Sequence, residues 1–274
     1  MLEGLALHWG FYFVAKPDPK GVGVTDLSYA MDFIRQHPEW KEDLSELAPE
    51  QRSSQHDANR QITTDCLKRL LVARILVFEA FLEEAIQLDG KLEAKHRHFW
   101  LLFQLFEKPG TVACPDRTEH PFLHVLKCLE HISHEVIETL VNRMLLIHST
   151  HIAPGRFVIG LDEIQHAVRR SPSCFMTSGG KFIYRSMLQE IVTVLKLATP
   201  DKLVVLGTGL SQRDIKEEMT AISGASVIVF HKLGLCDSSK KLQALFQQYV
   251  PPSILRSPSG VRLERRMREY LVGR

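Results

Sequence analysis

The sequence lacks the features that define several common protein classes. Its formal net charge is only +2 over 274 residues, too small by itself to favour a nucleic-acid-binding or membrane-surface protein. Its five cysteines are scattered and include no C-x-x-C pair, which is typical of reduced thiols inside the cell rather than of a disulfide framework. No basic segment followed by an apolar run opens the chain, so we expect no signal peptide and an intracellular location, cytoplasmic or nuclear.

The sequence also has no long uncharged apolar run. Its most apolar helical segment, residues 70–86, contains Arg74, Glu79, Glu83 and Glu84, and such charges are costly inside a membrane. Hydrophobic residues make up 45% of the chain and charged residues 24%, close to the globular average. We therefore expect a packed globular protein without a membrane span.

Short continuous apolar runs alternate with longer segments of helical periodicity. The four runs that predict buried strands are 11–14, 157–161, 203–206 and 226–230. The segments that predict helices are 27–35, 65–88, 96–106, 121–147, 184–197, 212–222 and 242–249. This alternation predicts an α/β domain with a parallel sheet covered by helices on both faces.

The spacing of these elements predicts the domain organisation. We expect a core over residues 1–250 with a large helical insertion at about 40–150, because the first two strands are much farther apart than one crossover requires. Within the insertion, the polar run from Glu50 to Asn59 predicts a disordered connection. Residues 251–274 predict a linker, marked by Pro251-Pro252, and the start of a helical lid.

Two acidic residues follow the second predicted strand. Asp162 and Glu163 come directly after the apolar run 157–161, which predicts two carboxylates at the carboxyl edge of a parallel sheet, where α/β folds bind ligands. In P-loop enzymes such an aspartate orients Mg²⁺ on the nucleotide phosphates, and the glutamate positions the attacking water. The alternative is structural: Asp162 caps the following helix and Glu163 favours its dipole.

The third predicted strand ends in a threonine between two glycines. Gly207, Thr208 and Gly209 follow the apolar run 203–206. In the same architecture a polar residue at this position contacts the γ-phosphate or the attacking water, and Thr208 is the candidate for this role. The glycines would allow close approach of the backbone. The alternative is an ordinary tight turn before a helix.

These motifs resemble the P-loop NTPase domain of crinkler-type proteins from fungi and oomycetes, which is related to STAND and AAA-like ATPases. The matching stretches include His-Trp-Gly-Phe-Tyr-Phe at 8–13, Leu-Asp-Glu-Ile-Gln at 161–165, Leu-Gln-Glu-Ile at 188–191 and Gly-Thr-Gly-Leu-Ser at 207–211. The resemblance implies binding and hydrolysis of ATP with Mg²⁺ held by Asp162. It also implies a phosphate contact or a neighbouring-subunit contact for Arg185, placed in the helix predicted at 184–197, and effector-like roles.

The sequence departs from this family at the phosphate loop. The motif G-x-x-x-x-G-K-[ST] would lie before Leu2, and it occurs nowhere in these 274 residues. Without it the chain has no nest of backbone N–H groups and no lysine for the phosphates. We therefore expect a truncated or degenerate NTPase domain that is inactive alone, a non-catalytic interaction scaffold, or a fragment of a longer ATPase.

The missing strand and loop also bear on partners. In the resembled fold, the strand before the phosphate loop lies in mid-sheet beside the strand at 203–206. Its absence would leave unpaired strand edges, which favour association. We therefore expect another protein chain or self-association as a partner. We expect the basic residues after position 260 to form an exposed helix surface rather than a nucleic-acid site. A metal site is likewise not expected at His120, His124, Cys128 and His131; their spacing lets them share one packed or exposed helix face.

Overall fold

The computed structural model describes residues 2–15, 22–105, 119–152, 157–176, 184–198 and 202–207, together with 257, 258, 261, 262 and 265. The chain divides into two units, residues 1–225 and 226–274. In the second unit, the amide of Val261 donates to the carbonyl of Ser257 at 3.0 Å, as in a helical turn. The strand predicted at 226–230 and the helices predicted at 212–222 and 242–249 lie outside the described residues.

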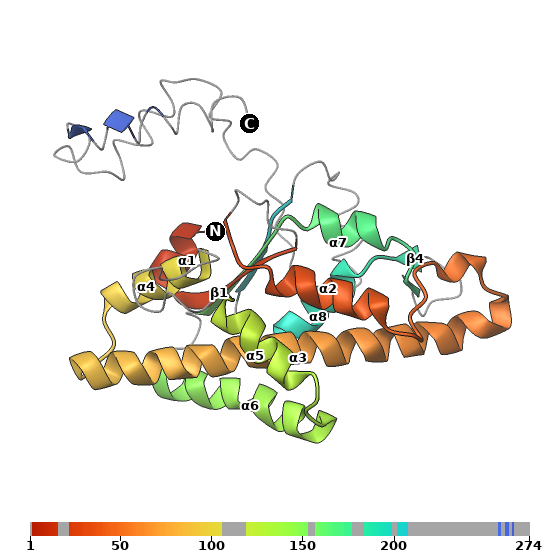
Figure 1. The fold of residues 1–274 in the computed structure, drawn as a ribbon, viewed down its shortest axis with the longest axis horizontal. Coiled ribbons are helices and arrows are strands. Elements are labelled where there is room, and N and C mark those ends of the chain that lie inside the picture. Colours follow the sequence, from red (N-terminus) through yellow and green to blue (C-terminus); the bar gives the residue numbers. More distant parts are fainter. Residues whose placement is uncertain are drawn as a thin grey trace. The chain divides into compact units, whose positions relative to one another are not determined.

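A parallel three-stranded sheet forms the centre of the first unit (Figure 1). Its strands are β1 (Trp9–Val14), β2 (Phe157–Asp162) and β5 (Lys202–Val205), in the order β1-β2-β5. Residue 9 lies beside 157 and residue 158 beside 202. The prediction of an α/β fold with a parallel sheet is confirmed, as are the three predicted strands in this range.

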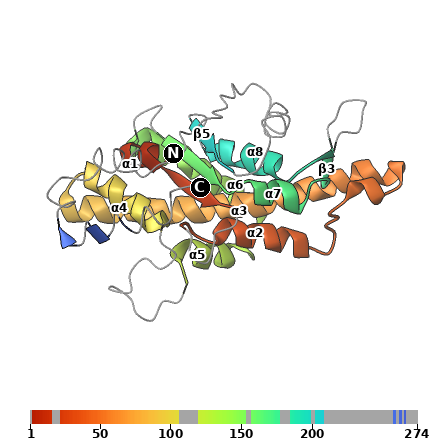
Figure 2. The ribbon, with the colours of Figure 1, turned by 90° about the horizontal axis from the view of Figure 1, so that it is seen from above.

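Side chains alternate between the two faces of the sheet, as the pleat requires. On one face Tyr12, Val14 and Val158 form a cluster with Leu5 and Leu101. The last two come from α1 (Leu2–Leu7) and α4 (Ala94–Leu105), which lie side by side in both views (Figures 1 and 2). These two helices therefore cover one face of β1 and β2.

The opposite face is aromatic. Phe11 of β1 contacts Phe157 of β2 with ring centroids 5.0 Å apart, and Phe78 of the long helix α3 (Pro49–Asp89) lies 5.7 Å from Phe11. All three rings are fully buried. Aromatic pairs in tilted and edge-on geometry add to the apolar burial that holds α3 against the sheet.

Among the described residues, the segment between β1 and β2 is mainly helical. It contains α2 (Asp26–Gln36), a 3₁₀ turn (Leu44–Glu46), α3, α4, α5 (Pro121–Leu129) and α6 (His134–His151). The helix α3 runs the length of this unit, and α2, α5 and α6 pack against it (Figure 1). Among the described residues, no helix is both long and apolar enough to cross a membrane.

The prediction that Glu50 to Asn59 is a disordered connection is wrong, because these residues form the first turns of α3. Pro49 begins the helix, a position where its missing N–H costs nothing. Asn59 is fully buried, and its side-chain amide donates to the carbonyls of Lys41 and Cys174. Tertiary contacts from distant segments therefore help to hold this polar sequence in a helix.

The helix predicted at 121–147 is two helices, α5 and α6. The guanidinium of Arg69 donates to the carbonyls of Leu129 and Ile132, both at 3.1 Å. A side chain of α3 thus satisfies carbonyl groups that an uninterrupted helix would pair internally.

The helix predicted at 184–197 begins later, as α8 (Leu188–Ala198). Before it, β4 (Tyr184–Arg185) pairs antiparallel with β3 (Phe175–Met176). The side chain of Phe175 packs on Trp40 and on His56 of α3, with ring centroids 6.0 Å apart in each case. This short two-stranded sheet is separate from the central one.

Candidate functional site

Asp162 ends β2 at the carboxyl edge of the central sheet, as the sequence predicts, and the structure makes β2 the middle strand. The hydroxyl of Tyr12, on the neighbouring strand, donates to Asp162 Oδ2 at 2.9 Å. The backbone N–H of Glu163 donates to Asp162 Oδ1 at 2.8 Å. Each carboxylate oxygen therefore accepts one hydrogen bond from the protein and keeps one lone pair for a ligand.

Tyr12 is buried, with 3% of its surface exposed. Burial, followed by the charge of Asp162, raises the pKa of the Tyr12 hydroxyl well above its usual value. The phenol therefore stays protonated at any physiological pH, and in this bond it is the donor while Asp162 is the acceptor.

Glu163 has a backbone conformation that is rare for its residue type. Its φ is +56°, in the left-handed region, and it is the one non-glycine residue with positive φ in the described part of the chain. Left-handed geometry costs an ordinary residue about 1–2 kcal/mol, and such strain gathers at functional sites. The positive φ ends the extended backbone of β2 at Glu163, and the Glu163 side chain remains 38% exposed.

The Glu163 side chain is held by the residues that follow it. The amide of Gln165 donates to Glu163 Oε2, and the imidazole Nε2 of His166 lies 3.8 Å from the same oxygen. Gln165 is only 4% exposed, so its position is fixed by packing. Glu163 is therefore an accessible carboxylate with a defined orientation.

The structural alternative for Asp162, a helix cap, is contradicted by the structure. The helix α7 (Gln165–Arg170) has Ile164 at its N-cap and no side-chain capping bond. The carboxylate of Asp162 instead bonds Tyr12 and the next backbone amide. Asp162 thus does not cap the helix, while Glu163 directly precedes its N-cap residue.

Gly207 lies directly beside the turn that carries Glu163. The N–H of Ile164 donates to the carbonyl of Leu206 at 3.2 Å, and the N–H of Leu206 to the carbonyl of Leu161 at 2.8 Å. A Cβ at Gly207 would lie 2.6 Å from Ile164 Cγ1 and 2.9 Å from Gln165 Oε1, so a glycine is needed for this contact. Thr208 and Gly209 lie outside the described residues.

Arg185 is not on a helix, contrary to the prediction. It lies in β4, opposite Phe175 of β3, because the chain forms a short antiparallel pair before α8 starts at Leu188. Its backbone carbonyl faces the thiol of Cys174, 3.8 Å away. The small sheet to which Arg185 belongs packs on the first part of α3 rather than extending the central sheet.

The residues at this edge suit a hard divalent cation. Carboxylate oxygens are the ligands that Mg²⁺ prefers, and it is commonly held by one or two carboxylates while phosphates and waters complete the octahedron. Asp162 offers one free lone pair on each oxygen, and Glu163 follows it directly. A closed cage is not formed here: the described residues contain no group of three or more His, Cys, Asp or Glu side chains arranged to hold a metal.

The histidines and cysteine spaced along residues 120–131 do not share one helix face. His120 is the N-cap of α5 and is buried: its Nε2 donates to the carbonyl of Phe103 at 3.1 Å, and its Nδ1 accepts from the amide of Phe122. His124 and Cys128 are exposed, with Nε2 and Sγ 4.0 Å apart. His120 is thus already committed to two backbone groups.

Sequence reasoning missed Tyr12 and Gln165 as members of this site. Tyr12 lies inside an apolar run in which every residue is buried. A buried tyrosine needs a partner for its hydroxyl, and this was the available signal. The identity of the partner depends on the strand register, which the sequence does not contain.

Comparison of the chain with protein-family models, with curated proteins and with solved structures found no match. The geometry of the residues themselves therefore carries the functional argument.

Proposed function

We propose that this chain carries the cation-binding and water-activating half of an ATP-hydrolysing site of the P-loop class, similar to that of crinkler-type ATPases. One observation carries the proposal: Asp162 ends the middle strand of a parallel sheet, and a strained, oriented Glu163 follows it directly. Open α/β sheets bind their ligands at this edge.

Each acid has a distinct role in this proposal. Asp162 holds Mg²⁺, directly or through a coordinated water, with the lone pairs left free by Tyr12 and Glu163. Glu163 accepts a proton from the attacking water or orients it, because its carboxylate is accessible and held in place by Gln165. The bound cation neutralises charge on the phosphates during transfer.

The phosphate grip is not part of this sequence, because the motif G-x-x-x-x-G-K-[ST] is absent from it. In the proposal, a segment or chain outside these 274 residues provides the phosphate loop. Gly207 supports the assignment, because it follows β5 and packs on the turn that carries Glu163. In the proposal, Thr208 is the residue that contacts the γ-phosphate or the attacking water.

The test is cation binding, measured with Mn²⁺ by electron paramagnetic resonance on the purified chain. We expect Asp162→Asn to weaken Mn²⁺ binding by about tenfold or more, because it removes the charged ligand. Asp57→Asn, which changes an exposed aspartate on α3, is the matched control and should bind as the wild type does. Equal binding by the wild type and Asp162→Asn would refute the proposal.

Glu163→Gln separates the two roles. This change preserves the shape of the side chain and leaves Asp162 intact, so Mn²⁺ affinity should stay close to that of the wild type. In a sample reconstituted with the phosphate loop, hydrolysis of ATP should fall by about 10²–10⁴-fold, the usual contribution of a general base. Retained hydrolysis would show that Glu163 is not the base.

A second candidate function is a non-catalytic interaction scaffold. Leu7 of α1 and Phe99 and Leu102 of α4 are large apolar residues with 61%, 58% and 46% of their surfaces exposed, on two helices that pack together. Light scattering distinguishes this candidate: Phe99→Glu should reduce self-association if this surface binds another copy. A monomeric wild type that binds Mn²⁺ through Asp162 would favour the first function.

A further inference from the structure

We propose that Tyr12 is a positioning residue for Asp162, and that a buried network of Gln104, Arg74 and Asp26 fixes Tyr12 for this role. The inference rests on the proposed function, because it assigns a residue that sets the cation affinity of the same site. Its basis is a continuous series of hydrogen bonds from the core beneath β1 to the carboxyl edge of the sheet.

The side chain of Tyr12 spans from its own strand to the next. Tyr12 lies beside Gly160 in the register, and Asp162 is two residues farther along β2 on the same face. Gly160 has no side chain, which leaves room for the tyrosine ring on this face. The hydroxyl can therefore reach Asp162 Oδ2, 2.9 Å away.

The ring is confined from the side of Gly23 as well. Gly23 has φ of +113°, and a Cβ there would lie 3.2 Å from Tyr12 Cε1 and 2.2 Å from Val14 Cγ2. The amide of Gly23 is held by the carbonyl of Leu105 at 2.9 Å. A fixed stretch of backbone thus packs against the ring, so Tyr12 has little freedom to change rotamer.

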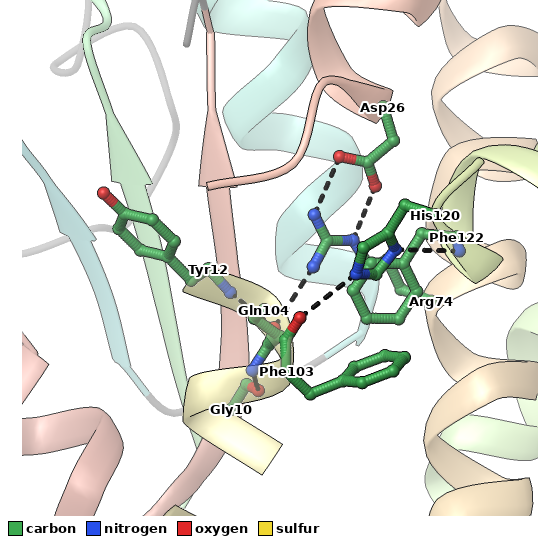
Figure 3. A network of polar contacts seen from close by, with 8 residues as sticks. All are labelled: Gly10, Tyr12, Asp26, Arg74, Phe103, Gln104, His120 and Phe122. Atoms are coloured by element: carbon green, nitrogen blue, oxygen red, sulfur yellow. Dashed lines mark hydrogen bonds and ion pairs between the residues drawn. The ribbon is translucent and has the colours of Figure 1, made fainter. Parts of the chain in front are cut away.

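The backbone of Tyr12 is held by a side chain that replaces a neighbouring strand (Figure 3). The N–H of Tyr12 donates to Gln104 Oε1 at 2.9 Å, and Gln104 Nε2 donates to the carbonyl of Gly10 at 3.1 Å. Both groups lie on the side of β1 that faces away from β2. The side-chain amide of Gln104 therefore pairs with the edge of the sheet as a peptide group would.

The indole of Trp100 completes this edge. Its Nε1 donates to the same Gly10 carbonyl at 2.7 Å. Both Trp100 and Gln104 come from α4 and are at most 1% exposed. The helix α4 thus lies along this edge of β1 and satisfies the N–H of Tyr12 and the carbonyl of Gly10, a way in which proteins protect an edge strand.

Gln104 is in turn oriented by a buried charge pair (Figure 3). Arg74 donates from one terminal nitrogen to Gln104 Oε1 at 3.2 Å, and from its other two nitrogens to Asp26. Because Arg74 can only donate, the end of the Gln104 amide that faces Arg74 must be its oxygen, Oε1. This fixes which end of the amide faces Tyr12 and which faces Gly10.

A carboxylate with a fixed orientation binds a cation better than one that must be ordered on binding. Partners that orient metal ligands typically account for about 10–100-fold in metal affinity. The Tyr12 hydroxyl holds one oxygen of Asp162, while the other is held by the amide of Glu163. Removing the hydroxyl frees the side chain to rotate, and the loss of order outweighs the gain of one free lone pair.

The experiment compares Tyr12→Phe with Tyr29→Phe. Tyr29 is the matched control, because its hydroxyl also donates to a carboxylate, Glu130 Oε1 at 2.7 Å, between α2 and the end of α5. We expect Tyr12→Phe to weaken Mn²⁺ binding by about tenfold and Tyr29→Phe to leave it unchanged. Circular dichroism confirms that both variants are folded, which we expect because each change removes one hydroxyl and keeps the ring.

A double-mutant cycle separates positioning from a general structural effect. In the Asp162→Asn background, Tyr12→Phe should cause no further loss of Mn²⁺ binding, because the ligand that Tyr12 positions is already changed. Equal losses in both backgrounds would refute a positioning role.

The outcomes distinguish this inference from the function on which it rests. If the wild type binds Mn²⁺ through Asp162 and Tyr12→Phe binds equally well, the role of Tyr12 is refuted and the proposed function stands. If Asp162→Asn binds as the wild type does, the proposed function and the role of Tyr12 both fail. Weakened binding by both Asp162→Asn and Tyr12→Phe, with Tyr29→Phe unchanged, supports both.

Discussion

The guanidinium of Arg74 and the carboxylate of Asp26 form a two-pronged ion pair in which neither side chain is exposed to solvent, with N–O distances of 2.6 and 2.8 Å. The Arg74 guanidinium also lies over the ring of Phe122, 3.8 Å from its centroid. A fully desolvated pair of this kind is costly to form and more costly to break.

Arg74→Met should therefore lower the free energy of unfolding by about 3–5 kcal/mol, because it leaves Asp26 buried without its partner. Arg35→Met is the matched control: Arg35 pairs with Glu42, and both side chains are partly exposed, at 29% and 45%. We expect a loss below about 1 kcal/mol there. Urea denaturation measures both, and equal losses would contradict the role of burial.

Removing both charges should cost less than removing one. The double variant Asp26→Leu with Arg74→Met replaces the pair by apolar side chains and leaves no isolated buried charge. We expect its stability to exceed that of Arg74→Met by urea denaturation. A double variant less stable than the single one would mean that the pair holds Gln104 and β1 more strongly than burial costs suggest.

Gln104→Leu tests the substitute strand edge. Leucine has a similar size but cannot pair with the N–H of Tyr12, and this N–H is then buried without an acceptor. We expect a loss of about 1–3 kcal/mol in the free energy of unfolding. The carbonyl of Gly10 keeps the indole of Trp100 as a donor, so a Trp100→Phe, Gln104→Leu double variant should lose more than either single one.

Gly23→Ala should be strongly destabilising. A Cβ at Gly23 would lie 2.2 Å from Val14 Cγ2, and the φ of +113° is strained for any other residue. Gly90, the C-cap of α3, is the control, because its φ is +72° but a Cβ there meets nothing within 4 Å. Thermal unfolding should show a loss of about 1–2 kcal/mol for Gly90→Ala and a larger one for Gly23→Ala; equal losses would mean that β1 shifts to accommodate the new methyl group.

The free energy of unfolding should decrease as the pH falls from about 6.5 to 4, because His120 is buried in its neutral form. Burial is the main cause that lowers the pKa of His120 to about 4 from 6.5, and its Nδ1 is occupied as an acceptor. Below pH 6.5 the unfolded chain binds a proton that the folded chain refuses, so stability is lost between about pH 6.5 and 4. With a shift of this size the loss is about 3 kcal/mol.

His120→Asn tests this linkage, because asparagine can cap α5 without titrating. The free energy of unfolding, measured by urea titration at several pH values between 4 and 7, should fall less steeply in this variant than in the wild type. Parallel curves for the two proteins would show that His120 is not the group responsible.

The apolar runs determined the central sheet because burial is their dominant interaction. In a strand, a run such as Phe11-Tyr12-Phe13-Val14 buries all of its side chains only if both faces of the sheet are covered. Accordingly, β1 is buried along its whole length. The same reasoning placed Asp162 and Glu163 at the carboxyl edge of the sheet. These features follow from local sequence alone.

The start of α3 shows where local sequence fails. Residues 50–59 are polar and predict disorder, yet they form a helix because Asn59 is buried between Lys41 and Cys174, residues 18 and 115 positions away. Arg185 fails for a similar reason: its strand exists through pairing with Phe175. The pattern of apolar and polar residues within a segment does not show which distant residues that segment will contact.

By itself, the sequence determined an α/β chain with a parallel sheet and two acids after a buried strand. The reason is that continuous apolar runs indicate buried strands, and their alternation with helical segments indicates that the strands are parallel. The tertiary structure alone decided that Tyr12 bonds Asp162, that Gln104 closes the edge of β1, and that Arg74 and Asp26 share the core. The physical reason is that hydrogen bonds between distant groups depend on register and helix packing, which are settled only when the whole core is assembled.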